Sequence, residues 1–273
     1  MKKRWSMLLF VWIVMLLPAS AWPPLAAAAG LAEEGVTIRA SLDKTIAAAD
    51  RQTADNLRSR YADLLASRKR EVEWEARIKA LHAANEAEAA DVRKQIALIG
   101  AEKKQQLTDA AKQTRERHQK LLDSYTAVNR QIELAKTIGA KEWASVLRTQ
   151  AALMKPAVQL AKDEIRAKDK ALQAAKDSAA KTAKLVRDTL AGVDTRKTGI
   201  KTRTTSAAAQ KKQYAAEWKS FTAAAKKTDV RTVVDSLATL VATSRQLVET
   251  REAIYDLELG VQGIVRKAKS QLP

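Results

Sequence analysis

Glycine and proline are almost absent from a long central part of the chain. Between residues 42 and 193, Gly100, Gly139, Pro156 and Gly192 are the only residues of these two types. Chains use glycine and proline to turn sharply, and alanine, the best helix former, supplies 53 of the 273 residues. The sequence therefore predicts an all-α fold. We expect long antiparallel helices in an elongated coiled coil or helical bundle.

The first residues have the pattern of a secretory signal peptide. Three basic residues precede an apolar run over residues 7–17, and small residues follow it. The run is shorter than the roughly 18 apolar residues that a membrane-spanning helix needs. We therefore predict a signal peptide over residues 1–29, with an uncleaved membrane anchor as the alternative. The small residues allow cleavage after Ala21, or after Ala28 or Ala29.

The spacing of apolar residues predicts where the long helices run. Within residues 41–98, apolar residues follow steps of three and four in two series, and the stripe shifts sideways between them around residues 68–72, so we expect one helix with a displaced apolar face. The same pattern resumes beyond Gly100 and again beyond Gly139. We expect a turn or a kink at each of these glycines, and a kink or an interruption at Pro156 because proline removes a backbone hydrogen bond.

A stretch rich in threonine and glycine divides the rest of the chain. Residues 192–206 combine Gly192 and Gly199 with many threonines, so we expect the helix to fail there. The sequence thus predicts a long helical coiled-coil region over residues 30–191, a basic linker over 192–206 and a C-terminal helical hairpin over 207–273. In the hairpin's last helix, which Thr228 or Asp229 can cap, apolar residues recur every seven positions.

Positive charge is concentrated in one segment. The chain carries a formal net charge of +18, and residues 196–227 contain nine basic residues and one acidic residue. A local excess of this kind favours an anionic partner. The candidate residues for binding an anionic surface are the basic and aromatic side chains of this segment: Arg196, Lys197, Lys201, Arg203, Lys211, Lys212, Tyr214, Trp218, Lys219, Phe221, Lys226 and Lys227.

The three aromatic residues of this segment have two opposed interpretations. Tyr214, Trp218 and Phe221 follow each other at steps of four and three, which places them on one helical face. The rings could pack against the apolar stripe of the last helix. They could instead lie at a lipid surface or stack on single-stranded bases, with nucleic acid ranked behind the other two.

The sequence does not support catalysis or metal binding. Residues 41–44 and 197–199 match the Ser-x-x-Lys and Lys-Thr-Gly elements of penicillin-binding proteins and β-lactamases, but a Ser-Asp-Asn element and strand patterns are missing. His82 and His118 are the only histidines, and the chain has no cysteine. We interpret both histidines as packing residues and Glu71, Glu73 and Glu75 as a solvated face with intrahelical ion pairs. We expect no catalytic residue, metal or cofactor.

These features together predict a non-enzymatic, secreted or cell-envelope-associated coiled-coil protein that acts as a scaffold, spacer or adhesin. Its basic segment would dock on an anionic cell-wall polymer or membrane surface. A lipid-binding protein with amphipathic helices is the alternative. Because the chain has few large side chains, we also expect homo-oligomers through helix pairing.

Overall fold

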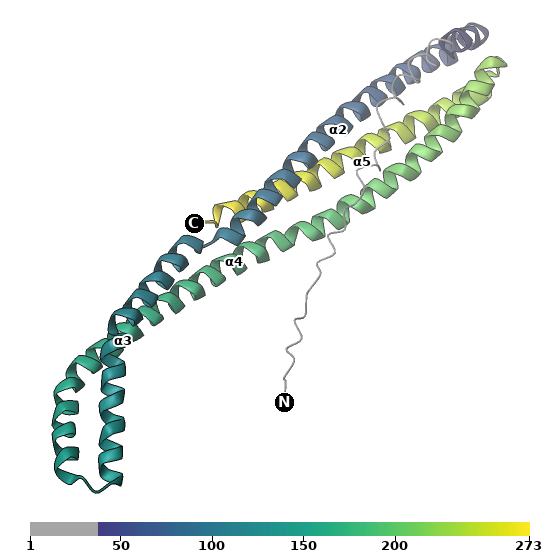
Figure 1. Cartoon of the computed structure of the whole chain (residues 1–273). Coiled ribbons are helices and arrows are strands. Elements are labelled where there is room, and N and C mark those ends of the chain that lie inside the picture. Colours follow the sequence, from purple (N-terminus) through teal and green to yellow (C-terminus); the bar gives the residue numbers. More distant parts are fainter. Residues whose placement is uncertain (1–37) are drawn as a thin grey trace. The chain divides into compact units, whose positions relative to one another are not determined.

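The computed structural model describes residues 38–273, so the predicted signal peptide lies outside the described residues. Within this range the regular structure is entirely helical, with no strand. Residues 38–48 are helical, and four long helices follow (Figure 1): α2 (Arg51–Leu98), α3 (Ala101–Thr137), α4 (Lys141–Lys226) and α5 (Val230–Ser270). The prediction of an all-α bundle of long helices is confirmed.

The described chain forms two compact units. Unit 1 contains residues up to Arg68 together with Gln210–Gln246, and unit 2 contains Lys69–Ala209 together with Leu247–Pro273. Helices α2, α4 and α5 each contribute residues to both units.

Unit 1 has a core of large apolar side chains. Leu42, Leu57, Phe221 and Leu237 are each no more than 1% exposed. At the start of α5, both carboxylate oxygens of Asp229 accept hydrogen bonds from Thr232, one from its backbone N–H at 3.2 Å and one from its hydroxyl at 2.7 Å. Asp229, one of the two residues that the sequence offered for this cap, is therefore the N-cap of α5.

Unit 2 contains a three-helix core and a two-helix hairpin. The three-helix core is formed by α2, α4 and α5, and its buried residues are Ala89, Val92, Ile96, Ile99, Ala183, Val186, Leu190, Val193, Val261, Val265 and Ala268. Helix α3 and the first part of α4 form the hairpin (Figure 1), and its smaller core contains Val128, Ile132, Ala135, Ala144, Leu147 and Ala151. The turn at Gly139 reverses the chain direction between the two helices of the hairpin.

Helix α4 is continuous through every position where the sequence predicted a break. Pro156 lies inside the helix with its ring exposed, and residues 192–206 are helical throughout. The predicted interruption at Pro156 and the predicted failure of the helix over 192–206 are therefore wrong. An exposed proline costs one backbone hydrogen bond but displaces no core side chain, and packing on both sides keeps the helix intact.

The two glycines of this linker prediction contribute to packing instead. A methyl group on Gly192 would lie 3.4 Å from Cδ1 of Ile264, and one on Gly199 would lie 3.3 Å from Cδ1 of Leu257. Both contacts join α4 to α5. A missing side chain therefore allows the two helices to approach closely, which is why glycine here does not signal a loop.

Other breaks agree with the sequence, and one was not foreseen. Gly100 and Gly139 both have positive φ, 66° and 75°, so the predicted breaks near them are confirmed. The expected single helix over 41–98 is wrong because it is interrupted at Ala49 and Asp50. Asp50 accepts hydrogen bonds from the backbone and the hydroxyl of Thr53 at 3.0 and 2.6 Å, which caps α2.

Alanine substitutions at three glycines should separate backbone strain from steric overlap. At Gly139, where no atom would contact the new methyl group, strain from positive φ should lower the free energy of unfolding by about 1–2 kcal/mol. At Gly100 the new Cβ would lie 2.9 Å from Cβ of Ala179, so the loss should be larger. Gly263 lies in α5 with open space and ordinary φ, so alanine there should add roughly 0.5–1 kcal/mol.

Urea unfolding followed by circular dichroism measures all three values. An equal loss at Gly100 and Gly139 would contradict the contact with Ala179.

Candidate anion-binding groove on helices α4 and α5

Two arginines of the predicted basic segment border a groove in unit 2. Arg196 and Arg203 are two turns apart on α4, with Gly199 between them, so the three residues share one face of the helix. Facing them on α5 are Ala253 and Leu257. Since Gly199 and Ala253 have little or no side chain, a space of about 470 Å³ remains between the two helices.

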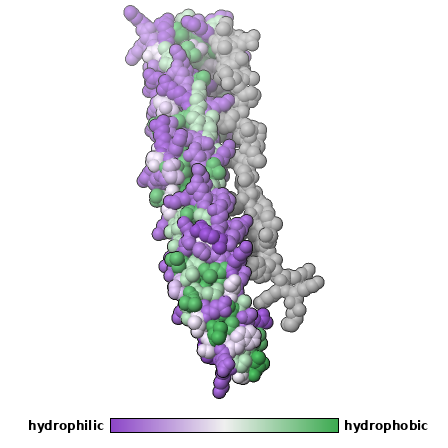
Figure 2. Space-filling view, turned by 60° about the vertical axis from the view of Figure 1, so that its left-hand side comes forward, coloured by the Kyte–Doolittle hydropathy of each residue, from purple (hydrophilic) through white to green (hydrophobic). Residues whose placement is uncertain are grey.

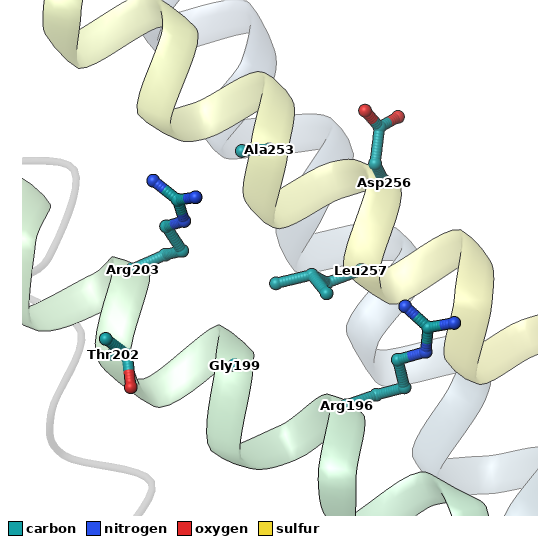
Figure 3. A pocket seen from close by; sticks show the side chains of 7 residues that line it. All are labelled: Arg196, Gly199, Thr202, Arg203, Ala253, Asp256 and Leu257. Atoms are coloured by element: carbon teal, nitrogen blue, oxygen red, sulfur yellow. The ribbon is translucent and has the colours of Figure 1, made fainter.

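The guanidinium groups lie on either side of this groove (Figure 3). Both arginine side chains reach from α4 toward α5, while the carboxylate of Asp256 projects away from the groove. Arg196 extends across α5 at Gly260, where its Nε would lie 3.2 Å from an added methyl group. Within residues 38–273, neither arginine has a carboxylate within ion-pair distance, so both can bind an external anion.

The neighbouring basic residues differ in their availability. Lys197 forms an ion pair with Glu86 of α2, with 2.8 Å between Nζ and Oε1. Burial would raise the pKa of Glu86, but the positive charges of Lys197, His82 and Arg93 together lower it. Lys201 is exposed to solvent. Of the four predicted anion-binding residues in unit 2, only Arg196 and Arg203 line the groove.

The remaining eight predicted residues lie in unit 1, and their aromatic members face inward. Tyr214 and Phe221 are buried, at 8% and 0% exposure, and Trp218 is half-buried between them. The guanidinium carbon of Arg68 lies 4.8 Å above the centre of the Tyr214 ring. Four lysines are exposed and Lys211 is half-buried; the exposed ones are Lys212, Lys219, Lys226 and Lys227.

Unit 2 also contains a buried polar site that the sequence analysis missed. Glu258 of α5 is 1% exposed, and its carboxylate contacts Nδ1 of His82 and accepts a hydrogen bond from the Asn85 amide, both at 2.8 Å. The Asn85 amide also donates to the backbone carbonyl of Glu258 at 2.9 Å. The only sequence signal was that Asn85 lies on the apolar stripe of α2.

A second buried charge lies one heptad earlier on α5. Arg251 is 5% exposed and its guanidinium lies 3.1 Å from the Glu75 carboxylate and 3.9 Å from that of Glu71. Glu71 is itself 2% exposed. The interpretation of these glutamates as a solvated face is therefore wrong for Glu71 and Glu75, because α5 covers them, and Glu73 alone is exposed.

The other sequence motifs have simple structural positions. His118 contacts Glu164 of α4 across the hairpin, with 2.7 Å between Nε2 and Oε2, and this contact lowers the pKa of Glu164. The Lys-Thr-Gly element at 197–199 lies inside a helix. Within residues 38–273, no cluster of three potential metal ligands occurs, and none of the helices there has an apolar stretch long enough to span a bilayer.

Comparisons with known proteins identify no relative of this chain. No family model matches the chain, and neither the curated proteins nor the solved structures include a significant match.

The contact between His82 and Glu258 should contribute stability to unit 2 in mild acid that is lost in mild base. The hydrogen bond to Glu258 raises the pKa of His82, against the smaller opposing effect of burial. A pKa that is higher in the folded state stabilises the fold below the unfolded value of about 6.5, and this stabilisation disappears as pH rises through the folded value. Glu86 also favours the charged imidazole, and Lys197 opposes it.

Urea unfolding at pH 5.5 and pH 8.5 tests this expectation on the wild type and on His82→Gln. The difference in stability between the two proteins should be large at the lower pH and should shrink at the higher one. A difference that does not change with pH would show that the imidazole acts through packing alone.

Proposed function

We propose that this protein is a secreted or cell-envelope-associated, non-enzymatic helical protein that serves as a scaffold, spacer or adhesin. In this proposal the basic segment of α4 docks on an anionic surface. The observation that supports it best is the pair of guanidinium groups of Arg196 and Arg203, which border one groove without a carboxylate partner in the described chain.

The chemistry of the groove favours an extended anion over a compact ligand. The groove is open to solvent, and no buried polar side chain lines it. Arginine binds phosphate and carboxylate groups through paired N–H donors, and two arginines at a spacing of seven residues are about 10 Å apart along the helix axis. A polymer with repeated phosphate or carboxylate groups can contact both at once. A cell-wall polymer is therefore the partner we put first.

A lipid surface is the alternative, and the aromatic residues of unit 1 bear on it. Tyr214 and Phe221 are buried in the folded unit, so these rings could reach a bilayer only if the helices of unit 1 separated. The exposed lysines of unit 1 could attract anionic lipid without that change. Nucleic acid stays the third candidate because stacking on bases requires the same rings.

Removing the two groove arginines should weaken binding to polyphosphate, used here as a soluble anionic polymer. We expect Arg196→Gln combined with Arg203→Gln to lower the affinity at least about tenfold, because charge-assisted hydrogen bonds are lost. The control variant, Arg148→Gln combined with Lys155→Gln, removes the same amount of positive charge from the hairpin. It should lower the affinity for polyphosphate only about twofold. Fluorescence anisotropy at several salt concentrations measures both, and equal losses would refute a specific groove.

The lipid alternative predicts a different response from Trp218. If unit 1 opens on a bilayer, the surroundings of Trp218 should become more apolar. Its fluorescence emission should then shift to the blue with phosphatidylglycerol vesicles but not with phosphatidylcholine vesicles. Trp218→Phe should remove that shift, and added salt should suppress it. If unit 1 stays closed, as the burial of its rings favours, the emission will not move.

A further inference from the structure

The α3–α4 hairpin carries a row of large apolar side chains that are more than half exposed to solvent. Their exposure ranges from 55% for Trp143 to 79% for Leu153. The members on α4 are Trp143, Val146, Leu153 and Leu160, and the others are Leu134 on α3 and Ile138, the residue that ends α3. The space-filling view shows exposed apolar residues among polar ones in its lower part, where this hairpin lies (Figure 2).

These residues form a second seam beside the one that is already buried. On α4, Trp143 and Val146 come directly before the buried Ala144 and Leu147, and Leu153 comes directly before Met154, which packs against the same core, so each lies about 100° around the helix from that core. Leu134 comes before the buried Ala135 in the same way. The two antiparallel helices of the hairpin are related by a local two-fold axis normal to the plane that contains them. Residues that directly precede a buried residue on either helix therefore lie on the same side of the hairpin.

The spacing of the exposed seam is that of a coiled coil. Starting from Trp143, the positions alternate by three and four residues and read Trp143, Val146, Gln150, Leu153, Ala157 and Leu160. A period of 3.5 residues keeps such a row aligned with another helix. Because the hairpin core is only two helices wide, a further helix on this side would extend that core directly.

The seam is complementary to itself in the antiparallel direction. Pairing two copies about a point between residues 151 and 152 sets Trp143 against Leu160 of the second copy, Val146 against Ala157 and Gln150 against Leu153. In each half of a contact of about 27 Å, the smaller Val146–Ala157 pair then lies between two larger pairs. The two Gln150 amides lie beside the symmetry axis, where a polar residue in a seam fixes register.

The charges around the seam do not suit an anionic bilayer. Glu142 and Asp163 border the seam on its outer edge, whereas an exposed basic row with a spacing of seven lies on the opposite side of α4: Lys141, Arg148, Lys155 and Lys162. A bilayer that covered the apolar seam would therefore meet carboxylates, and the cations would point away from it.

We propose that this seam binds a second copy of the same chain, forming an antiparallel two-fold dimer through the hairpins. A single short seam lies at the small end of specific interfaces, so the dimer should have a dissociation constant on the order of 10 µM. The proposal is independent of the groove on α4 and α5, since the two surfaces share no residue.

Sedimentation of the full chain over a range of concentrations tests the proposal. We expect a monomer–dimer equilibrium that Leu153→Glu weakens at least tenfold. The matched control is Leu65→Glu, since Leu65 is 52% exposed on α2 and lies outside the hairpin. A wild-type chain that stays monomeric on the order of 100 µM, or an equal effect of both variants, would overturn the proposal.

The absence of native cysteine allows a direct test of the symmetry. Gln150→Cys places a thiol beside the proposed axis and should form a disulfide-linked dimer under mild oxidation. Lys155→Cys places one on the opposite side of the same helix and should not. Cross-linking of Lys155→Cys but not of Gln150→Cys would overturn the geometry, as would binding of the monomer to phosphatidylglycerol vesicles that Leu153→Glu abolishes.

Discussion

The close contact between α4 and α5 in unit 2 depends on residues without side chains. Gly192 and Gly199 of α4 leave room for Ile264 and Leu257 of α5, and Gly260 of α5 leaves room for Arg196. In each pair the two residue numbers sum to the same value, so the helices run antiparallel with one constant register. This contact both completes the three-helix core and leaves the groove whose sides the arginines form.

The buried charges explain why one register is preferred over its neighbours. Heptad repeats alone allow α5 to shift by seven residues along α2 and still bury apolar side chains. Arg251 and Glu258 are seven residues apart, and their partners are Glu75 and His82. A shift by one heptad would bring Glu258 to the glutamates that now hold Arg251. Such repulsion at buried positions disfavours the shifted register more than the native pair stabilises the correct one.

Helix content, the two glycine turns and the cap at Asp229 could be predicted from sequence because each depends on local chemistry. The roles of Gly192 and Gly199 could not be predicted from local sequence. A glycine in a linker and a glycine that lets two helices pack closely cannot be distinguished until the contacting residues of the other helix are known. Glu71 was misassigned for a similar reason: its partner, Arg251, is 180 residues away. Arg196 and Arg203 were recognised by charge, but the groove between them depends on Ala253 and Leu257 from another helix.

The two proposed surfaces would reinforce each other. The hairpin seam excludes the groove residues, so each copy in a dimer retains its own pair of arginines. An anionic polymer that binds one groove then meets the second at an effective concentration set by the dimer, so the combined affinity exceeds that of a single groove without any new contact. A weak groove and a weak dimer contact would then give firm attachment to a polymer with many charges. Attachment to a small anion, which can occupy only one groove at a time, would stay weak.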